Sequence, residues 1–204
     1  KQEGSFAVLY SKHELGRELG QALKGAGIPF QIAKTTDALN HVLISHLLDI
    51  ITCIHLLSEG AGNDDALLYR VLHLTYLQPK PYDLQRLILA YTAKDRKDIS
   101  TLYMWMSDSD KLDQLALRDR PWMEKTAGLL SDAITAYHSM TLMSFVEWVV
   151  NHFGMMTWVL TQPEKFSHLY ALKTFFNFTD QQASGKTSFR VPDLLEICNL
   201  MTSY

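Results

Sequence analysis

Very few side chains in this sequence have the type and spacing that catalysis requires. Gly185-Lys186-Thr187 has the form of the last residues of a phosphate-binding P-loop, but Asp180 stands where that motif needs its first glycine. The residues before it have a helical pattern, whereas a P-loop follows a hydrophobic strand. We therefore predict no nucleotide site at this position.

The histidines and acidic residues also lack the spacing of a catalytic or metal site. His41 and His46 are five residues apart, which misaligns them on a helix, and no Glu lies between them as in zinc proteases. Asp64 and Asp65 are adjacent, so on a helix they point in different directions, and capping of a helix start is the favoured interpretation. Local motifs indicate no Ser–His–Asp or Cys–His arrangement. We predict no catalytic residue, no metal site and no cofactor bound to this chain.

The remaining candidates are basic residues around a proline-containing turn. Lys80 lies in the turn QPKP, Arg86 follows one turn into the next predicted helix, and Lys94, Arg96 and Lys97 lie in the connector AKDRKD. Cationic side chains and backbone N–H groups at the end of a helical pair can contact the phosphate backbone of DNA. The alternative is a solvated helix face followed by a charged connector.

Length and composition allow one substantial domain, or a domain with a smaller appendage. The chain has 204 residues, of which 47% are hydrophobic, so there is enough material for a packed core. The net charge of −3 gives no general attraction to nucleic acid, and DNA contact would need a local basic patch. Cys53 and Cys198 are far apart within apolar helical patterns, which predicts buried free thiols and suits a reducing cytosol.

The two ends of the chain give no sign of targeting. No apolar run reaches the ~18 residues of a membrane span, and no signal peptide opens the sequence. Because the first residue is Lys1, we expect the chain to be part of a longer protein.

Helical periodicity covers most of the chain. Residues 62–89 predict a helix, a turn and a second helix, because the prolines of QPKP cannot continue a helix and Asp83 can cap the next one. Further on, Pro121 suits the first turn of a helix, and Thr141 is expected to cap another. Only residues 6–10 and 28–32, on either side of a helical pattern, have the composition of short buried strands.

These patterns predict a mainly α fold with two parts. Residues 1–35 form a strand-helix-strand fragment, and residues 36–204 form a multi-helix domain. A unit of two strands and one helix cannot cover both faces of its own strands, so we expect the fragment to belong to a larger sheet.

The order of these signals resembles the UvrD/Rep-type superfamily 1 DNA helicases over nearly the whole chain. FAVLY at residues 6–10 looks like the start of the family's fourth motif, and GIPF at residues 27–30 is similar to the GIPY that follows it. The apolar stretch 44–57, then NDDA at residues 63–66 and LYRVL at residues 68–72, is similar to the region that contains the family's DDDAAFRRI sequence. Residues 142–154, the long helix to Phe178 and VPDLLE at residues 191–196 look like the later half of the same region.

In these helicases, the region is the helical accessory domain, usually called 2B, which is inserted into the second motor domain. The resemblance implies that residues 1–35 are a fragment of the motor-domain sheet and that residues 36–204 are the 2B-like domain. Such a domain rotates, contacts the duplex ahead of the fork, and restrains or stimulates unwinding. The ATP-binding motifs are not in this chain, so ATP and Mg are expected only for the parent motor domains and no ATP hydrolysis is expected here.

Two positions depart from the family pattern. Ser11 stands where the fourth motif has an arginine that reaches the ATP phosphates, with Lys12 and Arg17 as the nearest substitutes. The turn at residues 78–82 lies where many members have a glycine-containing hairpin whose backbone approaches the duplex, and prolines forbid that arrangement here.

The sequence therefore predicts an accessory domain of an ATP-dependent DNA helicase that contacts duplex or forked DNA weakly and without sequence preference. Its DNA-binding residues are expected to be Lys80, Arg86, Lys94, Arg96 and Lys97. Its other partners are the motor domains of the same polypeptide, with no membrane contact. Its location is cytoplasmic, or nucleoid-associated if the parent is bacterial.

The alternative is a helical protein-interaction domain without DNA contact. Its partner surface would be made by the aromatic and methionine side chains of Met104-Trp105-Met106 and Met155-Met156-Thr157-Trp158. Core packing also accounts for most of these residues.

Overall fold

The computed structural model describes residues 8, 19, 22, 23, 25–28, 38–60, 65–95, 97–186 and 188–202. The chain divides into two compact units, Lys1–Asp37 and Ala38–Tyr204. The expected boundary was after residue 35. Of the two predicted strands, only Val8 and Ile28 lie among the described residues, and neither is in a strand. The strand-helix-strand fragment is thus not supported, although the described residues Leu19, Ala22, Leu23 and Gly25 between those segments are helical.

The fold is mainly α, as the periodicity predicted. In the described part of the chain there are ten α-helices, two short 3-10 helices and no strand. In chain order these elements are η1 (Ala38–Asn40), α2 (Val42–Glu59), α3 (Asp65–Leu72), η2 (Thr75–Leu77), α4 (Pro81–Thr92), α5 (Leu102–Ser107), α6 (Ser109–Asp113), α7 (Arg120–Ser139), α8 (Leu142–His152), α9 (Met155–Thr161), α10 (Lys165–Ala183) and α11 (Val191–Thr202).

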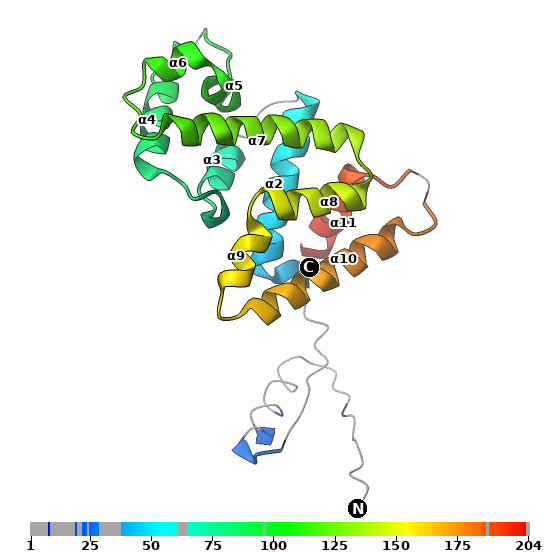
Figure 1. Cartoon of the computed structure of the whole chain (residues 1–204). Coiled ribbons are helices and arrows are strands. Elements are labelled where there is room, and N and C mark those ends of the chain that lie inside the picture. The colour runs from blue at the N-terminus through cyan, green and yellow to red at the C-terminus, as the bar shows by residue number, and fades with distance from the viewer. Residues whose placement is uncertain are drawn as a thin grey trace, which may run out of the picture. The chain divides into compact units, whose positions relative to one another are not determined.

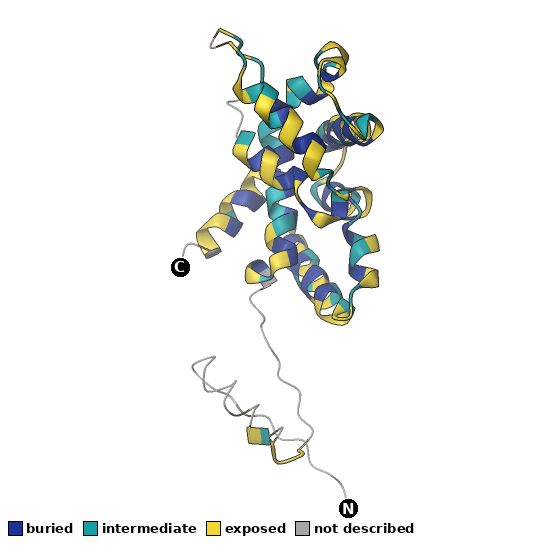
Figure 2. Cartoon of the chain, turned by 90° about the vertical axis from the view of Figure 1, so that its left-hand side faces the viewer, coloured by how far each residue is buried: buried dark blue, intermediate teal, exposed yellow. Residues whose placement is uncertain are grey.

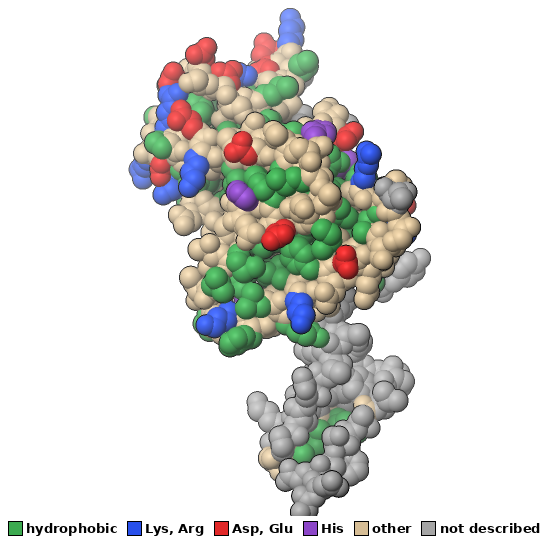
Figure 3. Space-filling model, turned by 45° about the vertical axis from the view of Figure 1, so that its right-hand side comes forward, with side chains coloured by type: hydrophobic (Ala, Val, Ile, Leu, Met, Phe, Trp, Pro, Cys, Tyr) green, Lys and Arg blue, Asp and Glu red, His purple; other side chains and the backbone are tan. Residues whose placement is uncertain are grey.

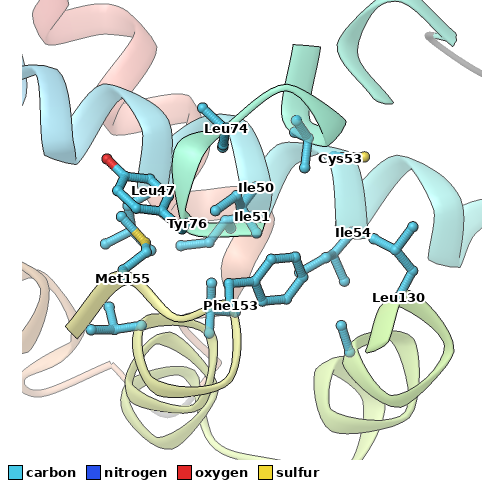
Figure 4. Close-up of a cluster of buried hydrophobic side chains, with 14 of the residues drawn as sticks. Leu47, Ile50, Ile51, Cys53, Ile54, Leu74, Tyr76, Leu130, Phe153 and Met155 are labelled. Carbon is cyan, nitrogen blue, oxygen red and sulfur yellow. The ribbon is translucent and has the colours of Figure 1, made fainter. Parts of the chain in front are cut away.

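Helix α2 is the core of the helical unit, and η1, α3, α7, α8, α10 and α11 pack around it (Figure 1). Its side chains Ile50, Ile51 and Ile54 are fully buried, and Phe153 and Leu130 from neighbouring segments lie against them (Figure 4). Buried residues occupy the inward sides of the surrounding helices, and exposed residues occupy the outward sides (Figure 2). The apolar stripe seen in the sequence therefore marks the centre of the core.

By length and composition alone, α2 could also cross a membrane, and 39% of its residues are buried inside the helical unit. No apolar run as long as a membrane span was expected from the sequence, and by this measure α2 is one. A core helix enclosed by other helices has the same composition as a membrane span. The cytoplasmic location stays a prediction.

Helix ends follow the predicted chemistry at several positions. The Thr141 hydroxyl accepts the N–H of Ser144 at the start of α8, and Pro121 lies in the first turn of α7, as expected. Helix α2 begins at an unexpected cap, since the Nδ1 atom of His41 accepts the N–H of Leu43 at 3.2 Å. That hydrogen bond uses the lone pair of Nδ1, so His41 carries its proton on Nε2.

Asp65 does not act as the local cap that the sequence suggested. It is the first residue of α3, but one carboxylate oxygen accepts the N–H of Leu102, the first residue of α5, at 3.0 Å. The other oxygen accepts a short hydrogen bond from the hydroxyl of Tyr91, near the end of α4. One carboxylate thus joins three helices. Asn63 and Asp64 lie outside the described residues.

Both cysteines are buried thiols that form no disulfide with one another, as predicted. Burial raises the pKa of the Cys198 thiol to about 11. The thiolate is the reactive form of cysteine, so Cys198 is expected to be unreactive in the folded protein.

Candidate nucleic-acid interface

The candidate site lies where the turn after η2 meets the start of α4. Gln78 adopts the left-handed conformation with φ of 52°, and Lys80 is the residue that precedes the helix. Pro81 can begin α4 because the first residues of a helix need no N–H donor. The predicted helix-turn-helix arrangement is therefore present, with its turn closed by a second segment described below.

Asp83 was expected to cap α4, and the structure shows a different role. It lies within the first turn of α4, and its side chain is 1% exposed. One carboxylate oxygen accepts the N–H of Arg118 at 2.7 Å, and the other accepts the N–H of Asp119 at 2.9 Å. The sequence prediction was wrong because the partners of this carboxylate lie in the segment between α6 and α7.

These two hydrogen bonds to the Asp83 carboxylate, called the Asp83 clamp below, hold the backbone of Arg118 beside α4. The guanidinium carbon of Arg118 lies 3.9 Å from the centre of the Tyr82 ring, a cation–π contact. Arg86 is four residues after Tyr82, so it lies one turn further along the same face of α4. All three side chains are exposed. Sequence reasoning chose Arg86 but missed Arg118 and Tyr82.

Lys80 is held by a carboxylate. Its ammonium lies 3.0 Å from the Asp119 carboxylate, and the two side chains are 43% and 37% exposed. The hydrogen bond from Lys80, followed by the backbone N–H of Trp122, lowers the pKa of Asp119. Trp122 also donates from its ring nitrogen to the carbonyl of Leu77 at 2.8 Å, which ties the start of α7 to η2. Lys80 is therefore at the site but is partly neutralised.

Lys94 has an internal role. Its ammonium lies 4.0 Å from the centre of the Tyr91 ring and donates to the carbonyl oxygen of Ser100. The Ser100 hydroxyl in turn accepts hydrogen bonds from the Trp105 ring nitrogen at 2.7 Å and from Lys111 at 3.0 Å. This network links the end of α4 to α5 and α6. The contacts leave Lys94 less available to a ligand than Arg86.

The remaining two candidates are in the connector after α4. Lys97 is exposed, and its backbone N–H donates to the Asp95 side chain at 2.9 Å. Arg96 lies outside the described residues. The structure therefore brings Lys80 and Arg86 to one part of the surface and places Lys94 at the opposite end of α4.

The surroundings of the site carry both signs of charge. Acidic and basic side chains alternate at the end of the helical unit formed by α4, α5 and α6, at the top of Figure 3. Lys111 pairs with Asp98 at 3.4 Å, and Arg120 pairs with Asp113 and with Glu124. Arg86 and Arg118 have no carboxylate within ion-pair distance among the described residues. They are the cations at this site that remain open to an external anion.

Other candidate sites have weaker geometry. The residues before Gly185 belong to α10, in keeping with the rejected P-loop. A groove of about 440 Å³ between α2 and α11 is open to solvent and is lined by His55, Glu196 and Leu200 among others. In the described part of the chain, no three His, Cys, Asp or Glu side chains are grouped to hold a metal ion.

The partner surface considered as the alternative is mostly packed inward. Met106 and Met155 are buried, and Trp105 and Trp158 are half-buried, whereas Met104 is 57% exposed. A different apolar surface is exposed on α9 and α10, where Leu160, Phe166 and Tyr170 are 56%, 76% and 52% exposed.

Neither a protein-family model nor a curated protein matches this chain.

Proposed function

We propose that this chain is the 2B-like accessory domain of a UvrD/Rep-type DNA helicase, with a fragment of the motor domain before it. The helical unit would contact the duplex near the fork and regulate unwinding by rotating against the motor domains. The chain itself would not hydrolyse ATP. Its contact with DNA would be electrostatic, weak and independent of sequence.

The observation that carries the proposal is a pair of exposed arginines beside the first half of α4, neither of which has a carboxylate within ion-pair distance among the described residues. Arg86 lies on α4, and Arg118 reaches the same surface from the segment before α7. Exposed arginine side chains that are not paired with a carboxylate readily exchange water and counterions for phosphate oxygens. They lie beside the turn at residues 78–82, the position of the DNA-contacting hairpin in the helicases that the sequence resembles.

The distribution of helices adds support. The apolar stretch 44–57 lies within α2, LYRVL within α3, and VPDLLE at the start of α11. Each of these three stretches is thus part of a helix in one compact unit, Ala38–Tyr204. A helical domain inserted after a short motor-domain segment has this organisation.

A protein-interaction domain is the second candidate. The observation that favours it is the exposed apolar surface of Leu160, Phe166 and Tyr170 on α9 and α10. Exposed apolar side chains that cluster are common at partner interfaces. On this account the arginines of α4 would be solvated and without a ligand.

Charge reversal at the start of α4 separates the two candidates. Arg86→Glu combined with Arg118→Glu should abolish binding of the 204-residue chain to a forked duplex at low salt. A matched variant, Lys125→Glu with Lys173→Glu, makes the same change of net charge on exposed positions of α7 and α10. Equal losses in both variants, or no loss in the first, would contradict a DNA contact at α4.

A further inference from the structure

We propose that Arg118, stacked on Tyr82, is a phosphate-binding residue that acts together with Arg86 on the backbone of nucleic acid. This inference rests on the proposed DNA contact and adds to it a residue from a distant segment of the chain. The ligand class is a phosphodiester, which both arginines would contact on one surface.

Arg118 is oriented by its contact with the Tyr82 ring. The guanidinium carbon of Arg118 lies 3.9 Å from the centre of the Tyr82 ring, and arginine packs on aromatic rings through the flat face of its guanidinium. The N–H donors of arginine lie in the plane of the group, so they point outward around its rim. The rim is the part that forms paired hydrogen bonds with phosphate oxygens. Stacking on Tyr82 therefore orients Arg118 and leaves its donors available.

The backbone of Arg118 is held in place by Asp83. The buried carboxylate of Asp83 binds the N–H groups of Arg118 and Asp119, at 2.7 and 2.9 Å. Asp119 is further held, because its side chain accepts the N–H of Trp122 at 3.1 Å at the start of α7. A side chain whose backbone is already held in place loses less entropy when it binds a ligand.

The cations at this site differ in whether a carboxylate already binds them. Asp119 takes up Lys80 at 3.0 Å, so a phosphate would have to compete with a carboxylate for that lysine. Arg86 and Arg118 face no such competitor among the described residues. Tyr82 links the two arginines: Arg118 contacts its ring, and Arg86 lies one helical turn after it on the same face of α4. The binding surface is therefore predicted to be Arg118, Tyr82 and Arg86.

The test measures the salt dependence of duplex binding for Arg118→Ala in the 204-residue chain. Loss of one phosphate contact should lower the slope of log affinity against log salt by about 1, equally for unrelated duplex sequences. Lys173→Ala, an exposed lysine of α10, removes the same charge and should leave the slope unchanged. Equal slopes for wild type and Arg118→Ala, or equal changes in both variants, would overturn the inference.

Tyr82 gives a second test that does not alter charge. Tyr82→Leu removes the ring face and should weaken binding by about two- to fivefold, the range of an exposed cation–π contact, whereas Tyr82→Phe should bind as wild type does. Binding that weakens in Arg86→Ala but is unchanged in Arg118→Ala and Tyr82→Leu would reject this inference alone. No binding by the wild-type chain at low salt would reject the proposed DNA contact and this inference with it.

Discussion

The carboxylate of Asp83 on α4 accepts the backbone N–H of Arg118 at 2.7 Å, from a segment that follows α6. Because the same carboxylate also binds the N–H of Asp119, it fixes two consecutive residues against the first turn of α4. The candidate DNA-binding surface is therefore built on a buried polar contact between separate parts of the chain. Asp83 should therefore affect both the stability of the fold and the binding of DNA to this surface.

Asp83→Ala should lower the free energy of unfolding by about 3 kcal/mol, since it leaves two N–H groups without the charged acceptor that they had when folded. Asp132→Ala, at an exposed position of α7, should change it by less than about 0.5 kcal/mol. Urea unfolding followed by circular dichroism measures both. A loss in Asp83→Ala no larger than that in Asp132→Ala would show that the clamp contributes little.

The hydrogen bond between Tyr91 and Asp65 should be visible in a matched pair of tyrosine variants. Tyr91→Phe removes a donor to a carboxylate and should destabilise the fold by about 2 kcal/mol. Tyr103→Phe removes the hydroxyl of a half-buried tyrosine on α5 that makes no hydrogen bond to the described residues, and should be nearly neutral. Similar unfolding midpoints for the two variants would contradict the assigned role.

Stability should fall at alkaline pH because two tyrosines resist ionisation in the folded state. Burial raises the pKa of Tyr76 to about 12, and burial together with the hydrogen bond to Asp65 raises the pKa of Tyr91 to about 12. An unfolded tyrosine ionises near pH 10, so the unfolded state loses protons first. The contribution of these residues is therefore complete below pH ~10 and is lost as the pH rises through 12. Tyr91→Phe should flatten that loss, and an unchanged alkaline profile would oppose it.

Stability should also fall below neutral pH because of His41 and His46. Burial is the main cause that lowers the pKa of both histidines. The pKa of His41 is lowered further by His168 and raised in part by Glu164. The pKa of His46 is raised in part by Asp49 and lowered further by Arg70. A lowered pKa means that the unfolded state binds protons first, so the contribution is complete above pH ~6.5 and is lost as the pH falls through the folded pKa.

His41→Asn tests the part that His41 plays in this acid sensitivity. Asparagine retains an oxygen that can accept the N–H of Leu43 but does not titrate. The variant should be close to wild type in stability at pH 7 and should lose less stability than wild type between pH 7 and pH 5. Parallel pH profiles for the two proteins would count against a role for His41.

Alanine substitutions at three glycines should change the stability of the fold by different amounts. Gly154 has φ of +76°, and a Cβ there would lie 3.0 Å from the Tyr76 carbonyl oxygen. Gly60 has φ of +61° and open space around it. Gly154→Ala should therefore lower the free energy of unfolding more than Gly60→Ala does. The strained backbone alone should make Gly60→Ala cost about 1 kcal/mol. Gly128 lies in α7 with open space around it, so Gly128→Ala should stabilise the fold by about 0.5–1 kcal/mol. Thermal unfolding of the three variants checks the order.

Much of the helical architecture could be predicted from local patterns. Apolar periodicity located α2, and the caps at Thr141 and Pro121 follow from backbone chemistry that depends on neighbouring residues alone. The roles of Asp65 and Asp83 could not be predicted in this way, because their N–H partners belong to later segments. A residue suited to local capping was instead used for long-range contacts in both cases.

One sequence signal for the Asp83 clamp was available. Asp83 and Leu87 are four residues apart, so they share a face of α4, and the helical spacing of Leu84, Leu87 and Ile88 marks that face as inward. A carboxylate on the inward face needs hydrogen-bond donors, which indicates a distant partner. The sequence could not identify Arg118 as that partner. Nor could it show that Lys94 would be used within the fold, because both depend on how the helices pack.

The most direct test of the account is a fluorescence-anisotropy titration of the 204-residue chain with a short forked duplex at low and at moderate salt. The account predicts weak binding that fades as salt rises and is the same for unrelated sequences, because phosphate contacts release counterions and carry no sequence information. No binding even at low salt would contradict DNA contact by this chain, and binding that is insensitive to salt would contradict its electrostatic origin.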